Sequence, residues 1–436
     1  MRKNVVANFL GTAAIAASQL VSVPLYLRFL GPHEWGLVSI VLSWSSTLLL
    51  IETGISLSIS RNFSELKHMS SGDALNYLKL TERRYLKAVA ALAAVAVALI
   101  PIFNMLAPGI THQPGLPAAL SLSLLLAAAQ ICGAPYRGAL IGLGAQVRLN
   151  AIIGAFALLR NACAILLALR FPYMTAIAGA FIIISAMEAI VRRTATLQVT
   201  HRTHHISPAT ATPGHGAPTT SIALMCASIV GAAMAQSDRL YLSTAISPAL
   251  FGVYSIAATL SLAALQLIYP VSLALIPRLP EFTDPERLNA TLGRLYAAIA
   301  AVVAIAGLLV LLAGRNAMDL WLHDSRTSSA VFPLLLAHLA GTGVNAFSIP
   351  LHTRLLATHK DLGLLYASTA GLAFQLIFLA IFTHQLGAVA GAYAWIVGNV
   401  VQLTGFWISS RGFFRPIEPS IPHREGQSTE NGSCRA

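Results

Sequence analysis

The chain has 436 residues, of which 56% are hydrophobic and only 10% are charged, and its mean hydropathy is +0.70. A soluble domain carries about 25% charged residues, so this composition argues against a soluble enzyme, a disordered chain and a disulfide-rich secreted module. The formal net charge is nevertheless +12, from 28 Lys and Arg against 16 Asp and Glu. We therefore asked which segments of this apolar chain carry the positive charges.

Long apolar runs dominate the sequence, and a helix that crosses a bilayer needs about 20 such residues. The runs do not alternate apolar with polar residues, as the strands of a membrane barrel would. The sequence therefore predicts an all-α polytopic membrane protein with about 12 transmembrane helices. The expected spans are 5–27, 37–60, 85–108, 117–136, 150–170, 173–191, 219–247, 249–277, 294–314, 330–351, 362–383 and 388–410.

The distribution of Lys and Arg between the loops predicts the orientation in the membrane. With the N-terminus in the cytoplasm, the inside segments hold 22 of these residues, the outside segments four and the spans two. Cytoplasmic loops are enriched in Lys and Arg, so an N-in/C-in topology follows. The inside segments also hold 10 acidic residues, and 22 minus 10 accounts for the net +12. The charge therefore indicates topology and anionic lipid rather than nucleic acid.

Loop composition divides the chain into four parts. Residues 1–191 form a first six-helix bundle, and 192–218, rich in Pro, Thr, Gly and His, form a cytoplasmic linker. Residues 219–410 form a second six-helix bundle, and the polar segment 411–436 forms a disordered cytoplasmic tail. The linker contains His201, His204 and His205, but no carboxylate or thiol lies near them. We therefore expect neither a metal site nor a cofactor.

A short sequence pattern occurs once in each half. Leu25-Tyr26-Leu27 is followed by 32–40, PHEWGLVSI, and Leu240-Tyr241-Leu242 is followed by 248–256, PALFGVYSI. The shared pattern is L-Y-L and then P-x-x-aromatic-G, at an offset of 215 to 216 residues. Because six spans separate the copies, both halves insert in the same orientation. This predicts two bundles related by a pseudo-two-fold axis along the membrane normal, an arrangement that places a substrate between the halves.

These residues also resemble a known family. The segment 24–40 followed by 52–55, ETGI, and the segment 237–257 are similar to bacterial polysaccharide transporters, the O-antigen and exopolysaccharide flippases of the multidrug/oligosaccharidyl-lipid/polysaccharide export superfamily. The resemblance implies a V-shaped pair of bundles that moves an undecaprenyl-pyrophosphate-linked oligosaccharide across the bacterial inner membrane by alternating access. It implies lipid-linked oligosaccharide and membrane lipids as partners, with a polysaccharide polymerase and chain-length machinery as further candidates.

Two alternatives stay open from the sequence. A cation-coupled multidrug antiporter of the same superfamily would share the fold and the number of spans. A membrane-embedded glycan polymerase or transferase would need paired acids or a catalytic loop outside the bilayer, and the expected outside loops are short. No P-loop pattern is present, so the sequence predicts a transporter driven by something other than ATP, with no enzyme activity.

Four arginines are candidates for substrate binding. Arg160 lies near the centre of the fifth expected span, where a charge is costly, and a guanidinium binds phosphate oxygens in a bidentate manner. Its alternative role is an ion pair with Glu52 or Asp238. Arg239 lies in the seventh span, whereas Arg28 and Arg61 end the first and second spans, where snorkelling to the interface is the simpler interpretation.

Two acids within the spans are candidates for a coupling proton or sodium ion, or for structural ion pairs. Asp238 lies in the seventh span, and Glu52 lies in the second at the acidic position of the family pattern. Glu188 is expected to pair with Arg192, four residues later on the same helix. His338 is the only histidine well inside an expected span, and we expect it to contact a neighbouring helix rather than relay protons.

Overall fold

The computed structural model describes residues 2–66, 75–87, 89–91, 94, 115–204, 222–266, 285–358 and 360–411. Within these ranges every element of regular secondary structure is a helix, as the apolar runs predict. The helices are α1 (Arg2–Leu66), α3 (Leu116–Ile131), α4 (Ala134–Gly142), α5 (Gln146–Arg170), α6 (Met174–His204), α7 (Ile222–Ala245), α8 (Pro248–Gln266), α10 (Pro285–Leu322), α11 (Ser325–Ala357), α12 (Asp361–Leu386) and α13 (Val389–Arg411).

The helix α1 contains the first two expected spans and the turn between them. At Gly31 the backbone leaves the helical region, with φ 75° and ψ 169°, a conformation that glycine adopts readily because it has no side chain. Pro32 follows and starts the next helical segment, where its missing N–H costs no hydrogen bond. The carboxylate of Glu34 then accepts a hydrogen bond of 2.6 Å from the backbone N–H of Met174, the first residue of α6. A carboxylate at a helix N-terminus is electrostatically favourable.

Two boundaries in the N-terminal half bear on the expectations. The boundary expected between the fifth and sixth spans, at Phe171–Tyr173, is confirmed, because α5 ends at Arg170 and α6 begins at Met174. By contrast, α6 continues to His204, so the first part of the expected linker is helical. Arg192 pairs with Glu188 one turn earlier, as expected, and this pair supports the extension. Residues 205–221, which hold the rest of the linker, and 412–436, which hold nearly all of the tail, lie outside the described residues.

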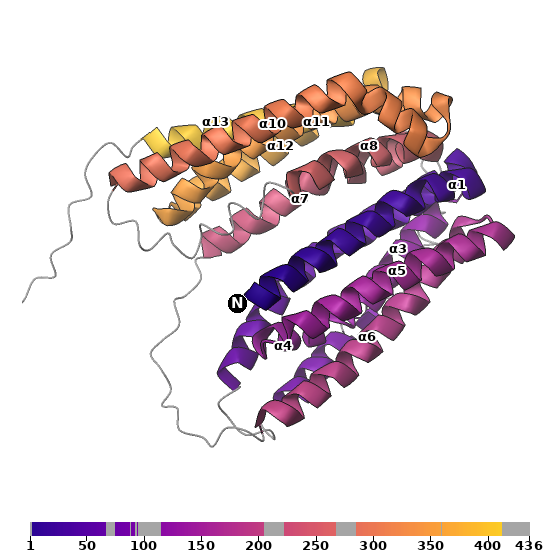
Figure 1. Cartoon of the computed structure of the whole chain (residues 1–436), viewed down its shortest axis with the longest axis vertical. Coiled ribbons are helices and arrows are strands. Elements are labelled where there is room, and N and C mark those ends of the chain that lie inside the picture. The colour runs from indigo at the N-terminus through magenta and orange to yellow at the C-terminus, as the bar shows by residue number, and fades with distance from the viewer. Residues whose placement is uncertain are drawn as a thin grey trace, which may run out of the picture.

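The ends of the helices fall at two ends of the molecule. The Gly31 end holds the turns at Gly31, Phe171–Tyr173, Ser247, His323 and Gly387, and the Thr358 end holds those at Leu143–Ala145 and Thr358–Lys360. Figure 1 shows α1 lying between the helices of the N-terminal half, α3 to α6, and those of the C-terminal half, α7 to α13. Among the described helices, most contacts between the halves are made by α1 with α7 and α8, and Trp321 of α10 adds a hydrogen bond to Leu20 of α1.

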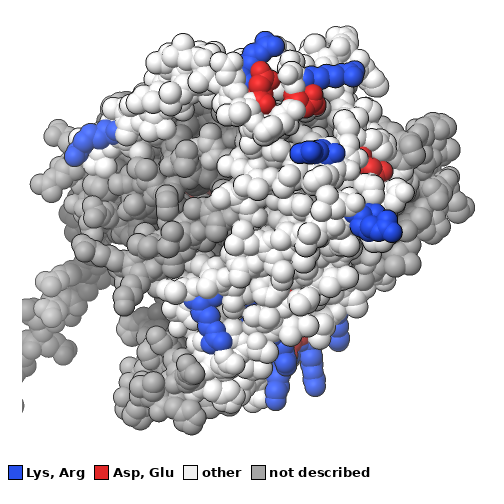
Figure 2. Space-filling model, turned by 45° about the vertical axis from the view of Figure 1, so that its right-hand side comes forward, with Lys and Arg blue, Asp and Glu red and all other residues white. Residues whose placement is uncertain are grey.

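Eight helices within the described ranges are long and apolar enough to cross a membrane. The most apolar is the segment Asn289–Leu322, with a mean hydropathy of 2.8. On the face shown in Figure 2, wide areas of uncharged surface separate small groups of charged side chains. Such a surface is typical of a multi-pass protein in contact with lipid.

Candidate functional site

The two copies of the repeated sequence pattern lie against each other. Gly36 and Gly252 hold the same position in the two copies, and a Cβ added to Gly252 would lie 3.1 Å from the Cα of Gly36. A Cβ added to Gly36 would overlap the backbone carbonyl of Pro248. Only glycine permits so close an approach of two backbones. The sequence repeat therefore forms the contact between α1 and α8 near the Gly31 end.

Three tryptophans donate hydrogen bonds across this interface. Trp35 Nε1 donates to the carbonyl of Gly252 at 3.3 Å, and Trp44 Nε1 donates to Ser243 Oγ at 2.9 Å. Trp321 Nε1, at the end of α10, donates to the carbonyl of Leu20 on α1 at 2.8 Å. Together with the glycine contact, these bonds hold the two halves closed at the Gly31 end.

Arg160 lies in the N-terminal half among polar side chains from two helices. Its guanidinium carbon is 5.8 Å from the centre of the Phe181 ring on α6, within the range of a cation–π contact. The neighbouring Asn161 accepts a hydrogen bond of 3.0 Å from Tyr26 Oη and donates one of 2.6 Å to Ser18 Oγ. Both partners are on α1. Arg160 makes no ion pair with any described side chain, and Asp238, one proposed partner, is engaged with Tyr254 and His338 instead.

Asp238 belongs to a buried cluster in the C-terminal half. Its carboxylate accepts a hydrogen bond from Tyr254 on α8, and its Oδ2 lies 3.3 Å from His338 Nε2 on α11. The same histidine nitrogen lies 3.0 Å from Tyr254 Oη. All three residues are at most 1% exposed. Asp238 Oδ1 and His338 Nδ1 have no hydrogen-bond partner among the described residues, so the cluster retains one acceptor position and one ring nitrogen for a proton.

Arg239 points to a different partner from its neighbour in sequence. Its Nη2 lies 3.5 Å from Thr259 Oγ1 on α8, and its buried Nε has no partner among the described residues. A buried N–H without an acceptor is costly, so Arg239 has unused binding capacity.

Of the remaining candidates, only Arg28 has a described side chain, and it does not join these clusters. Arg28 is exposed, three residues before the turn at Gly31. The side chains of Glu52 and Arg61 lie outside the described side chains, so their expected roles stay predictions. Among the described residues, no three His, Cys, Asp or Glu side chains are placed to hold a metal ion.

Three residues of these clusters did not stand out in the sequence. Tyr254 lies within the second repeat copy, Asn161 directly follows Arg160, and Ser243 follows the second L-Y-L. Their proximity in sequence to the motifs was the available signal. Their partners are 16 to 199 residues away along the chain, a separation that no local pattern indicates.

The long apolar helices of the described residues indicate a multi-pass membrane protein. Residues 1–283 match the family described as polysaccharide biosynthesis protein, and the chain belongs to this family. No curated protein matches the chain.

Solved structures of transporters in the MOP superfamily share the fold. An inward-facing multidrug resistance MATE family transporter is 14% identical, with a TM-score of 0.65 over 90% of this chain and 93% of that one. The lipid II flippase MurJ in an inward closed conformation is 11% identical, with a TM-score of 0.62 over 94% of this chain and 87% of that one. An outward-facing multidrug resistance MATE family transporter is 14% identical, with a TM-score of 0.55 over 93% of this chain and 94% of that one.

Proposed function

We propose that the protein is a flippase that moves an undecaprenyl-pyrophosphate-linked oligosaccharide, an O-antigen or exopolysaccharide repeat unit, across the bacterial inner membrane. Membership of the polysaccharide biosynthesis family and the fold shared with a lipid II flippase support this proposal. The twelve-span, N-in/C-in arrangement with a pseudo-two-fold axis is part of it. The Thr358 end would then face the cytoplasm and the Gly31 end the periplasm.

The observation that carries the proposal is the closure of one end by the two repeat copies. The three tryptophan bonds that join the halves lie between the Gly31 end and the level of Leu20 and Trp44 on α1. Arg160 lies near the middle of α5. Asn161, the neighbour of Arg160, is bonded to Ser18, so Arg160 lies level with the inner edge of this closure, where a substrate entering from the opposite end would meet it. Alternating access would consist of separating Gly36 from Gly252 while the Thr358 end closes.

A continuous chain of contacts joins Arg160 to this closure. The guanidinium of Arg160 is close enough to the Tyr26 hydroxyl to act on it electrostatically, and the Tyr26 ring stacks on Trp35 with 5.6 Å between the centroids. Trp35 in turn is bonded to Gly252 of the other half. A pyrophosphate bound by Arg160 would displace this chain at its first member, so substrate binding and opening would be coupled through packed side chains.

Coupling to an ion gradient is assigned to the cluster of Asp238, Tyr254 and His338. The cluster joins α7, α8 and α11, so a change in its protonation would alter how these helices pack. A proton is favoured over sodium because histidine occupies a position where a sodium site would need another oxygen. A polysaccharide polymerase with chain-length machinery remains the proposed partner downstream.

Translocation in a strain that lacks the gene tests the proposal directly. Lipid-linked oligosaccharide is measured in each membrane leaflet after complementation with wild type, Arg160→Ala or Arg160→Lys. We expect Arg160→Ala to retain the substrate in the inner leaflet and Arg160→Lys to restore it partly, because lysine keeps the charge but loses the bidentate geometry.

Arg170→Ala is the matched control, since it lies on the same helix and its guanidinium carbon is also 5.8 Å from a phenylalanine ring. It should transport normally. Unimpaired translocation in the deletion strain, with no second flippase gene, would overturn the function. Normal transport by Arg160→Ala would overturn only the role of this residue.

A cation-coupled multidrug antiporter is the second candidate, and the buried Asp238 and His338 favour it specifically. Its test is drug susceptibility of the same deletion strain. The antiporter would be favoured if the deletion strain became more susceptible to drugs but exported glycan normally, and if the gene carrying Asp238→Asn did not restore resistance. The expected result is unchanged susceptibility.

A further inference from the structure

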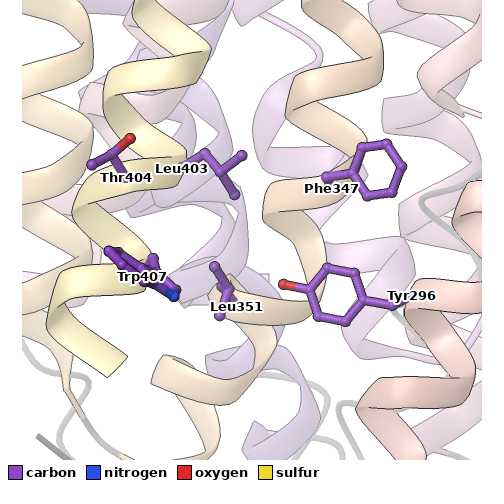
Figure 3. A pocket seen from close by; sticks show the side chains of 6 residues that line it. All are labelled: Tyr296, Phe347, Leu351, Leu403, Thr404 and Trp407. Carbon is purple, nitrogen blue, oxygen red and sulfur yellow. The ribbon is translucent and has the colours of Figure 1, made fainter. Parts of the chain in front are cut away.

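A groove of 390 Å³ lies in the C-terminal half between α10 and α13, with α11 as its floor. Its lining is aromatic and aliphatic apart from the hydroxyls of a tyrosine and a threonine, and consists of Tyr296, Phe347, Leu351, Leu403, Thr404 and Trp407. Figure 3 shows side chains from all three helices bordering this space. The volume is within the range of about 300–1,000 Å³ that is usual for ligand sites.

The groove lies on the side of α11 that faces away from the interface between halves. His338 and Thr342 of α11 contact α8, which in turn contacts α1. Phe347 lies nine residues after His338, which is about two and a half helical turns, so it points to the opposite side. Thr404 and Trp407 on α13 are exposed, and α10 is the most apolar candidate span. The groove therefore opens toward lipid rather than toward the path between the halves.

Arg354 and Lys360 lie beyond the six lining residues, toward the Thr358 end, and we call this pair the basic mouth of the groove. Phe347, Leu351 and Arg354 follow one another at spacings of four and three residues, so they share one face of α11. The guanidinium of Arg354 is close enough to the Tyr296 hydroxyl to act on it electrostatically. Arg354 has no ion-pair partner among the described side chains.

Lys360 completes the mouth from the start of α12. Its Nζ donates to the carbonyl of Ser409 on α13 at 2.9 Å, which places it beside the helix that carries Trp407. Burial and, after it, the positive charge of Arg354 lower the pKa of Lys360 from its ordinary value. Arg354 and Lys360 together make this end of the groove positively charged, which favours an anionic ligand. The adjacent Asp361 lies in the first turn of α12, where a negative charge stabilises the helix N-terminus.

We propose that this groove binds an anionic membrane phospholipid, with one acyl chain along Phe347, Leu351 and Leu403 and the phosphate at Arg354 and Lys360. The occupant is a structural lipid and not the transported substrate, because the groove is separated from the interface between halves by α11 itself. Bound there, the lipid would join α10 to α11 and α13. It would stabilise a helix that otherwise packs, among the described helices, mainly on α11.

Lipid binding to the purified, delipidated full-length protein in detergent tests this inference. The shift in melting temperature is titrated with phosphatidylglycerol and, in parallel, with zwitterionic phosphatidylcholine. We expect wild type to prefer phosphatidylglycerol. Arg354→Gln should bind it roughly fivefold more weakly, the equivalent of about 1 kcal/mol for one basic residue. Thr404→Trp should also weaken binding, because the indole fills the groove while leaving the basic mouth intact.

Two matched variants act as controls. Ile408→Trp adds the same side chain to α13 at an exposed position outside the groove, and Arg170→Gln removes an arginine at the Gly31 end of α5. Both should retain the preference of wild type. Equal stabilisation of wild type by the two lipids, or a preference that survives both Arg354→Gln and Thr404→Trp, would overturn the proposal. Stabilisation by polyprenyl phosphate but not by phosphatidylglycerol would also overturn it, since the groove would then take the substrate's chain. None of these outcomes depends on the transported glycan, so the proposed function is tested separately.

Discussion

Gly36 and Gly252, which are 216 positions apart and hold the same place in the two repeat copies, touch across the interface between the halves. The contact has no room for a side chain on either residue. It therefore gives the sequence repeat a physical reason, since each copy provides the surface that the other needs for close approach.

Gly36→Ala should open this contact. The added methyl overlaps the Pro248 carbonyl, and overpacking at a rigid backbone contact costs about 1–3 kcal/mol. We expect the closed Gly31 end to be depopulated. The measurement is labelling of Ser39→Cys, a buried position one turn after Gly36 whose hydroxyl has no described partner, by an impermeant thiol reagent in a background without the native cysteines. Gly231→Ala on α7, where a Cβ meets nothing within 4 Å, should label as slowly as the parent protein. Equal labelling of both variants would contradict the prediction.

The bond between Trp44 and Ser243 should contribute to the same closure. Trp44→Phe and Ser243→Ala each remove one partner of a hydrogen bond of 2.9 Å, which is worth about 1 kcal/mol. Each should shift the equilibrium toward opening roughly fivefold. The double variant should be little worse than either single one. Strictly additive effects on the distance distribution between spin labels on α1 and α7 would show that the two side chains do not interact.

His338→Ala should destabilise the C-terminal half strongly. It leaves the Asp238 carboxylate buried without its nitrogen partner, and breaking a buried pair in this way costs about 3–5 kcal/mol. Asp238→Asn combined with His338→Gln should recover part of the loss, because no uncompensated charge remains. Thermal unfolding in detergent measures this. Transport driven by an imposed proton gradient should be lost in both variants, and retention of that transport in the double variant would reject a coupling role.

Asp324→Asn should weaken the start of α11 in a pH-dependent manner. Hydrogen bonds from the Thr327 hydroxyl, and then from the Arg326 backbone, lower the pKa of Asp324 below its ordinary value. Its stabilising effect is therefore fully present above the unfolded pKa of about 3.9 and is lost as the pH falls through the lower folded value. We expect a difference of about 0.5–1 kcal/mol at pH 7, because the cap is exposed. The difference in unfolding free energy between wild type and Asp324→Asn should vanish near pH 2. A difference that persisted at that pH would show that the Asp324 charge is not its cause.

Much of the fold was accessible from sequence because apolar length and helix-ending residues act locally. The turn at Phe171–Tyr173 is confirmed, and Gly31 and Pro32 end one helical segment and start the next inside α1. The extension of α6 to His204 was missed, since its polar residues resemble a loop and are held by contacts such as that between Arg193 and Glu82, 2.9 Å apart. Contacts of this kind with another helix are not visible in local composition.

The polar clusters were less accessible. Arg160 and Asp238 were identified because charge within an apolar run is rare, but the partners of Asp238 were not. His338 lies 100 positions away and was assigned only to a helix contact, which it makes with Asp238 and Tyr254. Pairing of this kind depends on how α7, α8 and α11 pack, and periodicity along one helix carries no information about that.

Two of the three tryptophan bonds that join the halves end on main-chain oxygens, at Gly252 and at Leu20. A carbonyl is present whichever residue occupies the position. At Leu20 the acceptor half of the bond therefore persists through mutation, and paired substitutions between positions 20 and 321 are not required to preserve it. In a comparison of related chains, this part of the closure would leave its trace in the retention of an indole donor at position 321 and not in correlated changes across the interface.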